Sequence, residues 1–171
     1  PYFTPFMLSE LELSYLEFTI LTATAFGARV FTLPFLGRYV RRAGTKKVLW
    51  RAGLAISTFP ILWLASDHFA WLLLLQIVSG VSWAAFELAS LLSFFERIPP
   101  HGQTSVLTLY NLASATAIVL GSAAGGGLLR FFGEGPAGFA AIFVVSTLSR
   151  AAMLVFLRQV PDFEDPGPPP P

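Results

Sequence analysis

Long apolar stretches separated by short polar turns make up most of the chain. This pattern predicts an all-α protein whose helices approach or exceed the roughly 20 residues needed to cross a bilayer. The expected helices cover residues 15–36, 48–65, 69–97, 103–132 and 136–158. The apolar runs are long and do not alternate with polar residues, so a membrane β-barrel is not expected. The predicted fold is a polytopic bundle of transmembrane helices.

Several residues mark where these helices start, bend and end. Ser14 and Glu17 have the Ser-x-x-Glu spacing of a capping box, which starts a helix. Pro136 suits the first turn of the last helix, and Pro60 predicts a kink in the second. Before the capping box, residues 1–8 are apolar and aromatic but too short to span. We expect them to be the end of an earlier helix that begins upstream, with its rings at the membrane interface.

Composition indicates the same class of protein. Hydrophobic residues make up 54% of the sequence and charged residues 12%, about half the quarter that is usual in soluble domains. The mean hydropathy is +0.66. Because so little polar surface could not cover a soluble core, we expect an integral membrane protein with the lipid bilayer as a partner. The sequence contains no cysteine, which excludes disulfides and cysteine-based metal sites.

The densest charge lies between Gly37 and Arg51, where six of the eleven Lys and Arg residues fall. These six are Arg38, Arg41, Arg42, Lys46, Lys47 and Arg51. Short basic loops between apolar helices stay on the cytoplasmic side of a membrane, so residues 37–51 are predicted to form a cytoplasmic loop. Gly37 and Gly44 would allow it to turn tightly. A soluble protein whose basic face binds nucleic acid or acidic lipid is the alternative for such a stretch, but both flanks here are strongly apolar.

The other turns alternate in charge. The turn after Arg97 and the end at Arg158 are basic, whereas the turns near Asp67 and Glu134 carry acidic residues. The alternation predicts an amino end outside the membrane and a carboxyl end inside, in the cytoplasm. Residues 159–171 are acidic and then proline-rich, so they are predicted to be a disordered cytoplasmic tail.

The basic stretch resembles the signature loop of the major facilitator superfamily of secondary transporters, Gly-x-x-x-Asp-Arg-x-Gly-x-Arg/Lys-Arg/Lys. The matching positions are Gly37, Arg42, Gly44, Lys46 and Lys47. Arg41 stands where the family usually has Asp, which weakens the charge contact that the motif makes between helices. The loop also lies in the second inter-helix position counted from residues 1–8, as the family has it.

The resemblance extends to about Arg158 and implies a carboxyl-terminal half that begins late in the seventh of twelve helices. It implies five full spans plus the end of a sixth, and a missing amino-terminal six-helix half as partner. It also implies secondary active transport of a small solute by alternating access, in the plasma or inner membrane, with protons as a candidate coupling ion. It implies neither an enzyme activity nor a cofactor.

Three ionisable residues lie inside the expected spans: Arg29, Glu87 and Arg150. At 1.5 Å per residue they lie about 12, 15 and 12 Å from the basic ends of their helices, so they share one layer. For Arg29 and Glu87 two interpretations stay open, a charged layer that lines a substrate cavity or an ion pair that joins two helices. Glu87 is then either a proton site or a structural partner. For Arg150 we favour a structural role, because it is close enough to the interface to snorkel.

Polar residues form stripes along three of the apolar helices, and such stripes usually face the interior of a bundle. The candidates for the substrate or ion pathway are Thr22, Arg29, Gln76, Trp83, Glu87, Tyr110 and Asn111. Of the uncharged ones, Gln76, Trp83 and Asn111 are the best candidates for ligand contact. The alternative is hydrogen bonding between helices without a ligand. Because the layer carries a net positive charge, an anionic substrate group is weakly favoured.

Other motifs suggest packing rather than chemistry. Gly121 and Gly125 form a Gly-x-x-x-Gly step, which predicts close helix packing. Neither a preceding strand nor a following Gly-Lys-Ser/Thr supports a phosphate loop. His68 and His101, the only histidines, lie in turns on opposite sides, so no catalytic triad and no metal site are expected. A non-transporting membrane protein on the same scaffold, such as a receptor or an assembly subunit, is the alternative function.

Overall fold

The structure, a computed structural model, describes residues 2–133 and 135–159, and all of its regular elements are helical. The elements are α1 (Phe3–Pro5), the π-helical turn η1 (Phe6–Glu10), α2 (Tyr15–Ala43), α3 (Thr45–Leu62), α4 (Phe69–Arg97), the 3-10 turn η2 (Pro100–Gly102), α5 (Gln103–Phe132) and α6 (Pro136–Arg158). The last three long helices have the predicted bounds. The predicted tail lies, apart from Gln159, outside the described residues.

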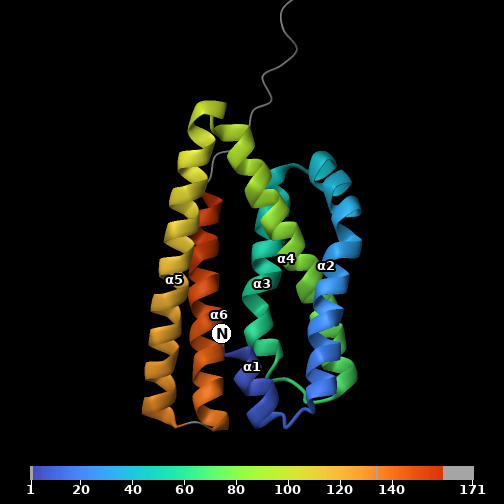
Figure 1. Cartoon of the computed structure of the whole chain (residues 1–171), viewed down its shortest axis with the longest axis vertical. Coiled ribbons are helices and arrows are strands. Elements are labelled where there is room, and N and C mark those ends of the chain that lie inside the picture. The colour runs from blue at the N-terminus through green and yellow to red at the C-terminus, as the bar shows by residue number, and fades with distance from the viewer. Residues whose placement is uncertain (1, 134, 160–171) are drawn as a thin grey trace, which may run out of the picture.

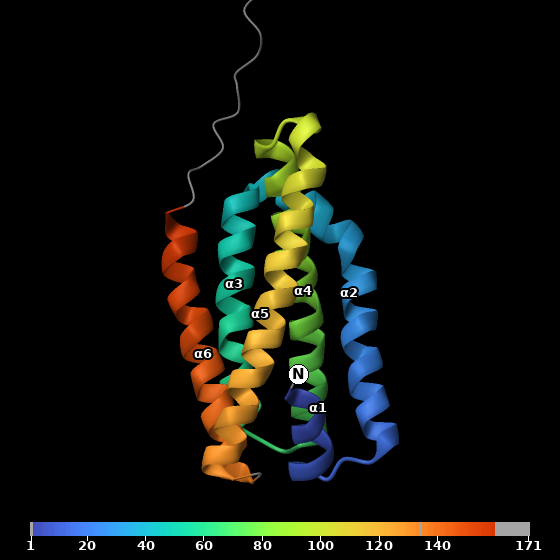
Figure 2. The same cartoon turned by 60° about the vertical axis from the view of Figure 1, so that its left-hand side comes forward.

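The five long helices run antiparallel along one axis (Figure 1). Their main contacts join α2 to α4, α4 to α3, α3 to α6 and α6 to α5. The turned view shows that this row is curved, with α5 in front of α3 and α4 (Figure 2). Because successive helices are antiparallel, the turn at Gly44, η2 and the end of α6 gather at one end of the molecule. The turns at residues 11–14 and 63–68, the end of α5 and the start of α6 gather at the other.

The predicted loop over residues 37–51 was wrong, because α2 continues to Ala43 and α3 begins at Thr45. Only Gly44 connects them, with a φ of +86° that residues with a side chain rarely adopt. Its N–H donates to the carbonyl of Val40 at 2.9 Å and closes α2. Gly37 stays inside α2 with open space around it. Arg and Lys have good helix propensity, so a run of basic residues does not by itself end a helix.

Within the described part of the chain, four helices are long and apolar enough to cross a membrane: α2, α4, α5 and α6. α3, predicted as a further span, is not among them, since it has 18 residues and carries Lys46, Lys47 and Arg51 near its start. One side of α3 is nevertheless packed along its length, with buried residues from Val48 to Pro60. A helix that is covered by its neighbours needs less apolar surface than one that faces lipid.

Two hydrophobic clusters hold the helices together. One contains Leu21, Leu72 and Phe143 and lies toward the end at which η1 packs. The other contains Val40, Val48 and Ala89 and lies beside the Gly44 turn. The buried residues of the two clusters come from α2, α3, α4 and α6, besides the amino-terminal segment and Trp63. From α5, Leu128 and Leu129 pack against the first cluster.

The amino-terminal aromatic residues pack inward against neighbouring helices, while the expected depth of their rings at the membrane interface stays a prediction. Phe6 is 5% exposed and its ring is 4.9 Å from that of Phe143. Phe3 stacks on the same ring at 4.9 Å. The Tyr2 ring lies against Gly125, and its hydroxyl donates to the carbonyl of Ser122. These rings fill the space between α3, α5 and α6, so their burial contributes to the packing of these helices.

Candidate functional site

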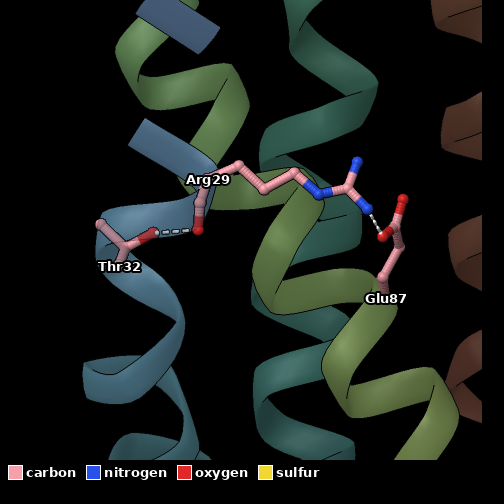
Figure 3. A network of polar contacts seen from close by, with 3 residues as sticks. All are labelled: Arg29, Thr32 and Glu87. Carbon is pink, nitrogen blue, oxygen red and sulfur yellow. Dashed lines mark hydrogen bonds and ion pairs between the residues drawn. The ribbon is translucent and has the colours of Figure 1, made fainter. Parts of the chain in front are cut away.

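Arg29 of α2 and Glu87 of α4 form an ion pair, as their similar depth in the sequence predicted. The Arg29 side chain extends from α2 across α4 to reach the carboxylate (Figure 3). The Thr32 hydroxyl donates to the carbonyls of Ala28 at 2.6 Å and Arg29 at 3.3 Å. The two charged side chains are 38% and 47% exposed, so the pair lies at an open face of the helix row.

A small pocket of about 100 Å³ lies beside this ion pair, between α2 and α4. It is lined by Ala25, Phe26, Arg29, Ser79, Gly80 and Trp83. The lining is mostly apolar and aromatic with one cation, which is the usual make-up of a ligand site. Its volume is below the roughly 300 Å³ at which drug-sized ligand pockets begin, so it fits one functional group of a ligand rather than a whole one.

The pocket depends on a close approach of two helices at Gly80. A Cβ atom placed there would overlap the carbonyl oxygen of Ala25 and lie 3.2 Å from the Cβ of Ala28. Only a residue without a side chain allows α4 to lie so near α2. The sequence signal for this contact is the spacing Gly80-x-x-x-Ala84, a small-residue pair that the Gly-x-x-x-Gly pattern does not include. Ala84 is 1% exposed.

Arg150 of α6 points into the helix row, so the expectation that it snorkels to the interface was wrong. Its guanidinium donates to the carbonyl of Ile56 on α3 at 3.1 Å. Its charge also lies 5.9 Å from the centre of the Trp83 ring, within the range of a cation–π contact. Trp83 therefore connects Arg150 with the pocket that Arg29 lines. Two cations of the predicted charged layer are therefore near Trp83: Arg150 over its ring, and Arg29 as a further lining residue of the same pocket.

The remaining pathway candidates lie away from this pocket. Thr22 and Gln76 are half-buried, and Asn111 is exposed on α5. The Tyr110 ring packs against Phe94 at 5.1 Å. The pocket unites only Arg29 and Trp83 of the seven candidates, with Glu87 bound to Arg29. Whether the others contact a ligand stays a prediction.

The glycine and signature positions are also clearly placed. Gly125 is buried under Tyr2, whereas a Cβ at Gly121 would meet nothing within 4 Å. Arg42 lies in the last turn of α2, Gly44 forms the turn, and Lys46 and Lys47 lie in the first turn of α3. Within residues 2–133 and 135–159, no group of three or more His, Asp or Glu residues could hold a metal ion.

Comparison with known proteins gives one match. The family model described as Major Facilitator Superfamily matches residues 1–171. The searches of curated proteins and of solved structures found no match.

Proposed function

The chain belongs to the major facilitator superfamily, and from that premise we propose that it forms the carboxyl-terminal half of a secondary transporter. The transporter moves a small solute across a membrane by alternating access between two six-helix halves. α3 is the fifth span in this proposal. Its 18 residues extend about 27 Å, close to the thickness of the hydrocarbon core. Its three charges lie toward one end, where water and headgroups can solvate them.

The Arg29–Glu87 ion pair carries this proposal. Charges within a span are costly unless they are paired or reach water. Pairing neutralises the two groups, yet both side chains remain well exposed at the face that the pocket opens on. Direct contact of that face with acyl chains would be unfavourable. A water-filled cavity, closed by the amino-terminal half, meets this requirement.

The charges around Trp83 support a solute with an anionic group. Arg29 and Glu87 cancel one another, which leaves Arg150 as a net positive charge beside the ring. A guanidinium has five N–H donors, and the contact with Ile56 occupies one of its nitrogens. A carboxylate or phosphate at the pocket would meet Arg29 in the lining, with Arg150 near the Trp83 ring. The opposite half supplies the rest of the ligand site, since the pocket here holds a single functional group.

Glu87 is the residue of this half that could carry a coupling proton. Its carboxylate is paired with Arg29. A proton on Glu87 would break the ion pair and release Arg29 toward the pocket. Proton movement and solute binding would then act on the same pair of side chains, which is what coupling requires.

We place the protein in the plasma or inner membrane, with the Gly44 turn and the carboxyl end in the cytoplasm. Basic residues favour this orientation. Those at the Gly44 end are Arg38, Arg41, Arg42, Lys46, Lys47, Arg51, Arg97 and Arg158. The other end has Arg130 alone among the described Lys and Arg residues.

Uptake by the full-length protein in liposomes tests the proposal. The solutes are a labelled monocarboxylate, a neutral sugar and an amine, each with and without a pH gradient. We expect uptake of the carboxylate, driven by the gradient. Arg29→Gln and Arg150→Gln should each reduce uptake per folded molecule by about 10-fold or more, the worth of one charge-assisted hydrogen bond.

Arg130→Gln is the matched control, because Arg130 is exposed at the far end of α5 and should leave uptake unchanged. Equal uptake of sugar and carboxylate would contradict the anionic solute. Tight binding of a solute without any flux would instead support a receptor on the same scaffold. This chain alone should give no solute-specific flux, since it supplies only one wall of the cavity.

A further inference from the structure

The turn between α2 and α3 concentrates positive charge on a small surface. Because Gly44 alone connects the helices, the last turn of α2 lies directly beside the first turn of α3. Arg38 and Arg42 are exposed on α2, and Lys47 and Arg51 are exposed on α3. Arg51 donates to the hydroxyl of Tyr39, which joins the two helices beyond the turn.

Acidic residues do little to balance this charge. The sequence from Arg38 to Arg51 contains neither Asp nor Glu. Glu96, near the end of α4, accepts a hydrogen bond of 2.8 Å from Thr45, and it brings a single negative charge to a surface with six basic residues. The surface therefore keeps a large excess of positive charge even when Glu96 is counted. Arg41 adds to it at the position where the resemblance to the family predicts Asp.

Apolar side chains continue the same two helix faces away from the turn. On α2, Phe35 is 68% exposed and lies three and seven residues before Arg38 and Arg42, so all three share one face. On α3, Leu54 is 43% exposed and lies three residues after Arg51. The Tyr39–Arg51 contact places these faces side by side. The combined surface is basic at the end of the molecule and apolar toward its middle.

We propose that this surface, formed by Phe35, Arg38, Arg42, Lys47, Arg51 and Leu54, binds an anionic phospholipid. The phosphate lies among the four cations and the acyl chains lie along Phe35 and Leu54. A soluble anion would satisfy only the basic part of the surface, whereas a phospholipid matches both parts. Basic clusters beside transmembrane helices attract anionic lipids with about 1 kcal/mol for each Lys or Arg.

The carboxyl-terminal tail is the competing occupant. α6 ends at the same end of the molecule, and the sequence after it contains Asp162, Glu164 and Asp165. The same stretch contains one aromatic residue, Phe163, but no long apolar segment that could cover both Phe35 and Leu54 as two acyl chains can. The experiment below therefore includes a variant that ends after Pro161.

Native mass spectrometry of the full-length protein in neutral detergent tests the proposal, with phosphatidylglycerol and phosphatidylcholine as probes. We expect phosphatidylglycerol adducts in excess over phosphatidylcholine. Arg42→Gln/Arg51→Gln should weaken phosphatidylglycerol binding about 30-fold, fivefold for each charge removed. Arg130→Gln removes an exposed cation at the opposite end of the molecule. It should change phosphatidylglycerol binding by less than about twofold. Size-exclusion chromatography confirms that both variants are folded.

Four results would overturn the proposal. Equal binding of the two lipids, or equal losses in the double variant and in Arg130→Gln, would mean that this surface has no lipid preference. Full displacement by excess inorganic phosphate would show that the surface binds the phosphate group alone. Phosphatidylglycerol binding that appears only in the variant without the tail would show that the tail occupies the surface.

Discussion

The guanidinium of Arg150 donates a hydrogen bond of 3.1 Å to the carbonyl oxygen of Ile56. In an α-helix this carbonyl would accept from the N–H of the residue four positions later. That residue is Pro60, which has no N–H, so α3 leaves the Ile56 oxygen without its partner. Arg150 supplies the missing donor from the neighbouring helix. The most buried helix of the row therefore depends on a charged side chain from α6.

This relationship predicts a strong coupling between Arg150 and Pro60. Arg150→Met should destabilise the protein by about 1–3 kcal/mol, because it leaves a polar oxygen unsatisfied away from water. In a Pro60→Ala background the same change should cost much less, since an alanine at this position restores the missing N–H. Unfolding of the full-length protein by sodium dodecyl sulfate in mixed micelles compares the parent protein, the two single variants and the double variant.

Pro34 provides the matched control. It lies inside α2 and leaves a similar gap there, but the guanidinium of Arg150 donates to α3. The changes in the free energy of unfolding caused by Pro34→Ala and by Arg150→Met should therefore add. If Arg150→Met costs the same in the parent protein and in the Pro60→Ala background, the Ile56 contact has no energetic role.

A second prediction concerns Arg29 and Glu87. Removing one partner leaves the other charge unpaired within a span, whereas removing both leaves none. Because the side chains are 38% and 47% exposed, we expect a coupling of about 1–3 kcal/mol, between the values for surface and buried pairs. A double-mutant cycle with Arg29→Gln and Glu87→Gln, followed by unfolding in micelles, measures it.

The control cycle pairs Arg29→Gln with Glu96→Gln. Glu96 lies on α4, as Glu87 does, but its carboxylate accepts a hydrogen bond from Thr45. The two losses of this control cycle should add. Strict additivity of Arg29→Gln and Glu87→Gln as well would show that their contact contributes nothing. If the double variant regains stability but does not take up solute, the pair also has a role in transport.

Local signals in the sequence were enough to place most helix ends. The capping box of Ser14 and Glu17 is present, with the Ser14 N–H donating to the Glu17 carboxylate at 2.9 Å. Pro136 occupies the first turn of α6. The basic stretch was misassigned because Gly37 and Gly44 look alike in sequence. Of these two, Gly44 has the positive φ, and the chain turns there so that α2 and α3 both pack against α4.

The candidate site was predictable to the extent that it follows from depth along the helices. Arg29 and Glu87 share a depth, and they meet. The partner of Arg150 could not be found in this way, because it requires knowing that α6 packs against α3. The same holds for Gly80, whose contact is the backbone of Ala25 on another helix. The position of a residue along its helix indicates its depth in the membrane, but it does not show which helix lies beside that residue.

A third prediction tests the close approach at Gly80. Gly80→Ala should destabilise the protein by about 1–3 kcal/mol, because the new methyl group overlaps the Ala25 carbonyl and forces the helices apart. Gly27→Ala is the control. Gly27 lies in α2, where an added methyl group would meet nothing within 4 Å, so Ala should stabilise that helix by up to about 1 kcal/mol. Equal effects of the two substitutions on unfolding would contradict the packing of α2 on α4.

The last prediction concerns orientation in the membrane. The Gly44 turn and η2 lie at one end of the molecule, and the turn at residues 63–68 lies at the other. These 171 residues contain no cysteine, so a single cysteine introduced among them is labelled without background from this part of the protein. We expect Asp67→Cys to react with an impermeant maleimide on intact cells, and Lys47→Cys to react only after permeabilisation, because basic ends stay in the cytoplasm. His101→Cys should behave like Lys47→Cys, since His101 belongs to η2 at the same end.

All three original side chains are exposed, so access does not depend on unfolding. Labelling of Lys47→Cys and Asp67→Cys to equal extent on intact cells would exclude the antiparallel arrangement across a bilayer, and reversed labelling would exclude the cytoplasmic Gly44 turn.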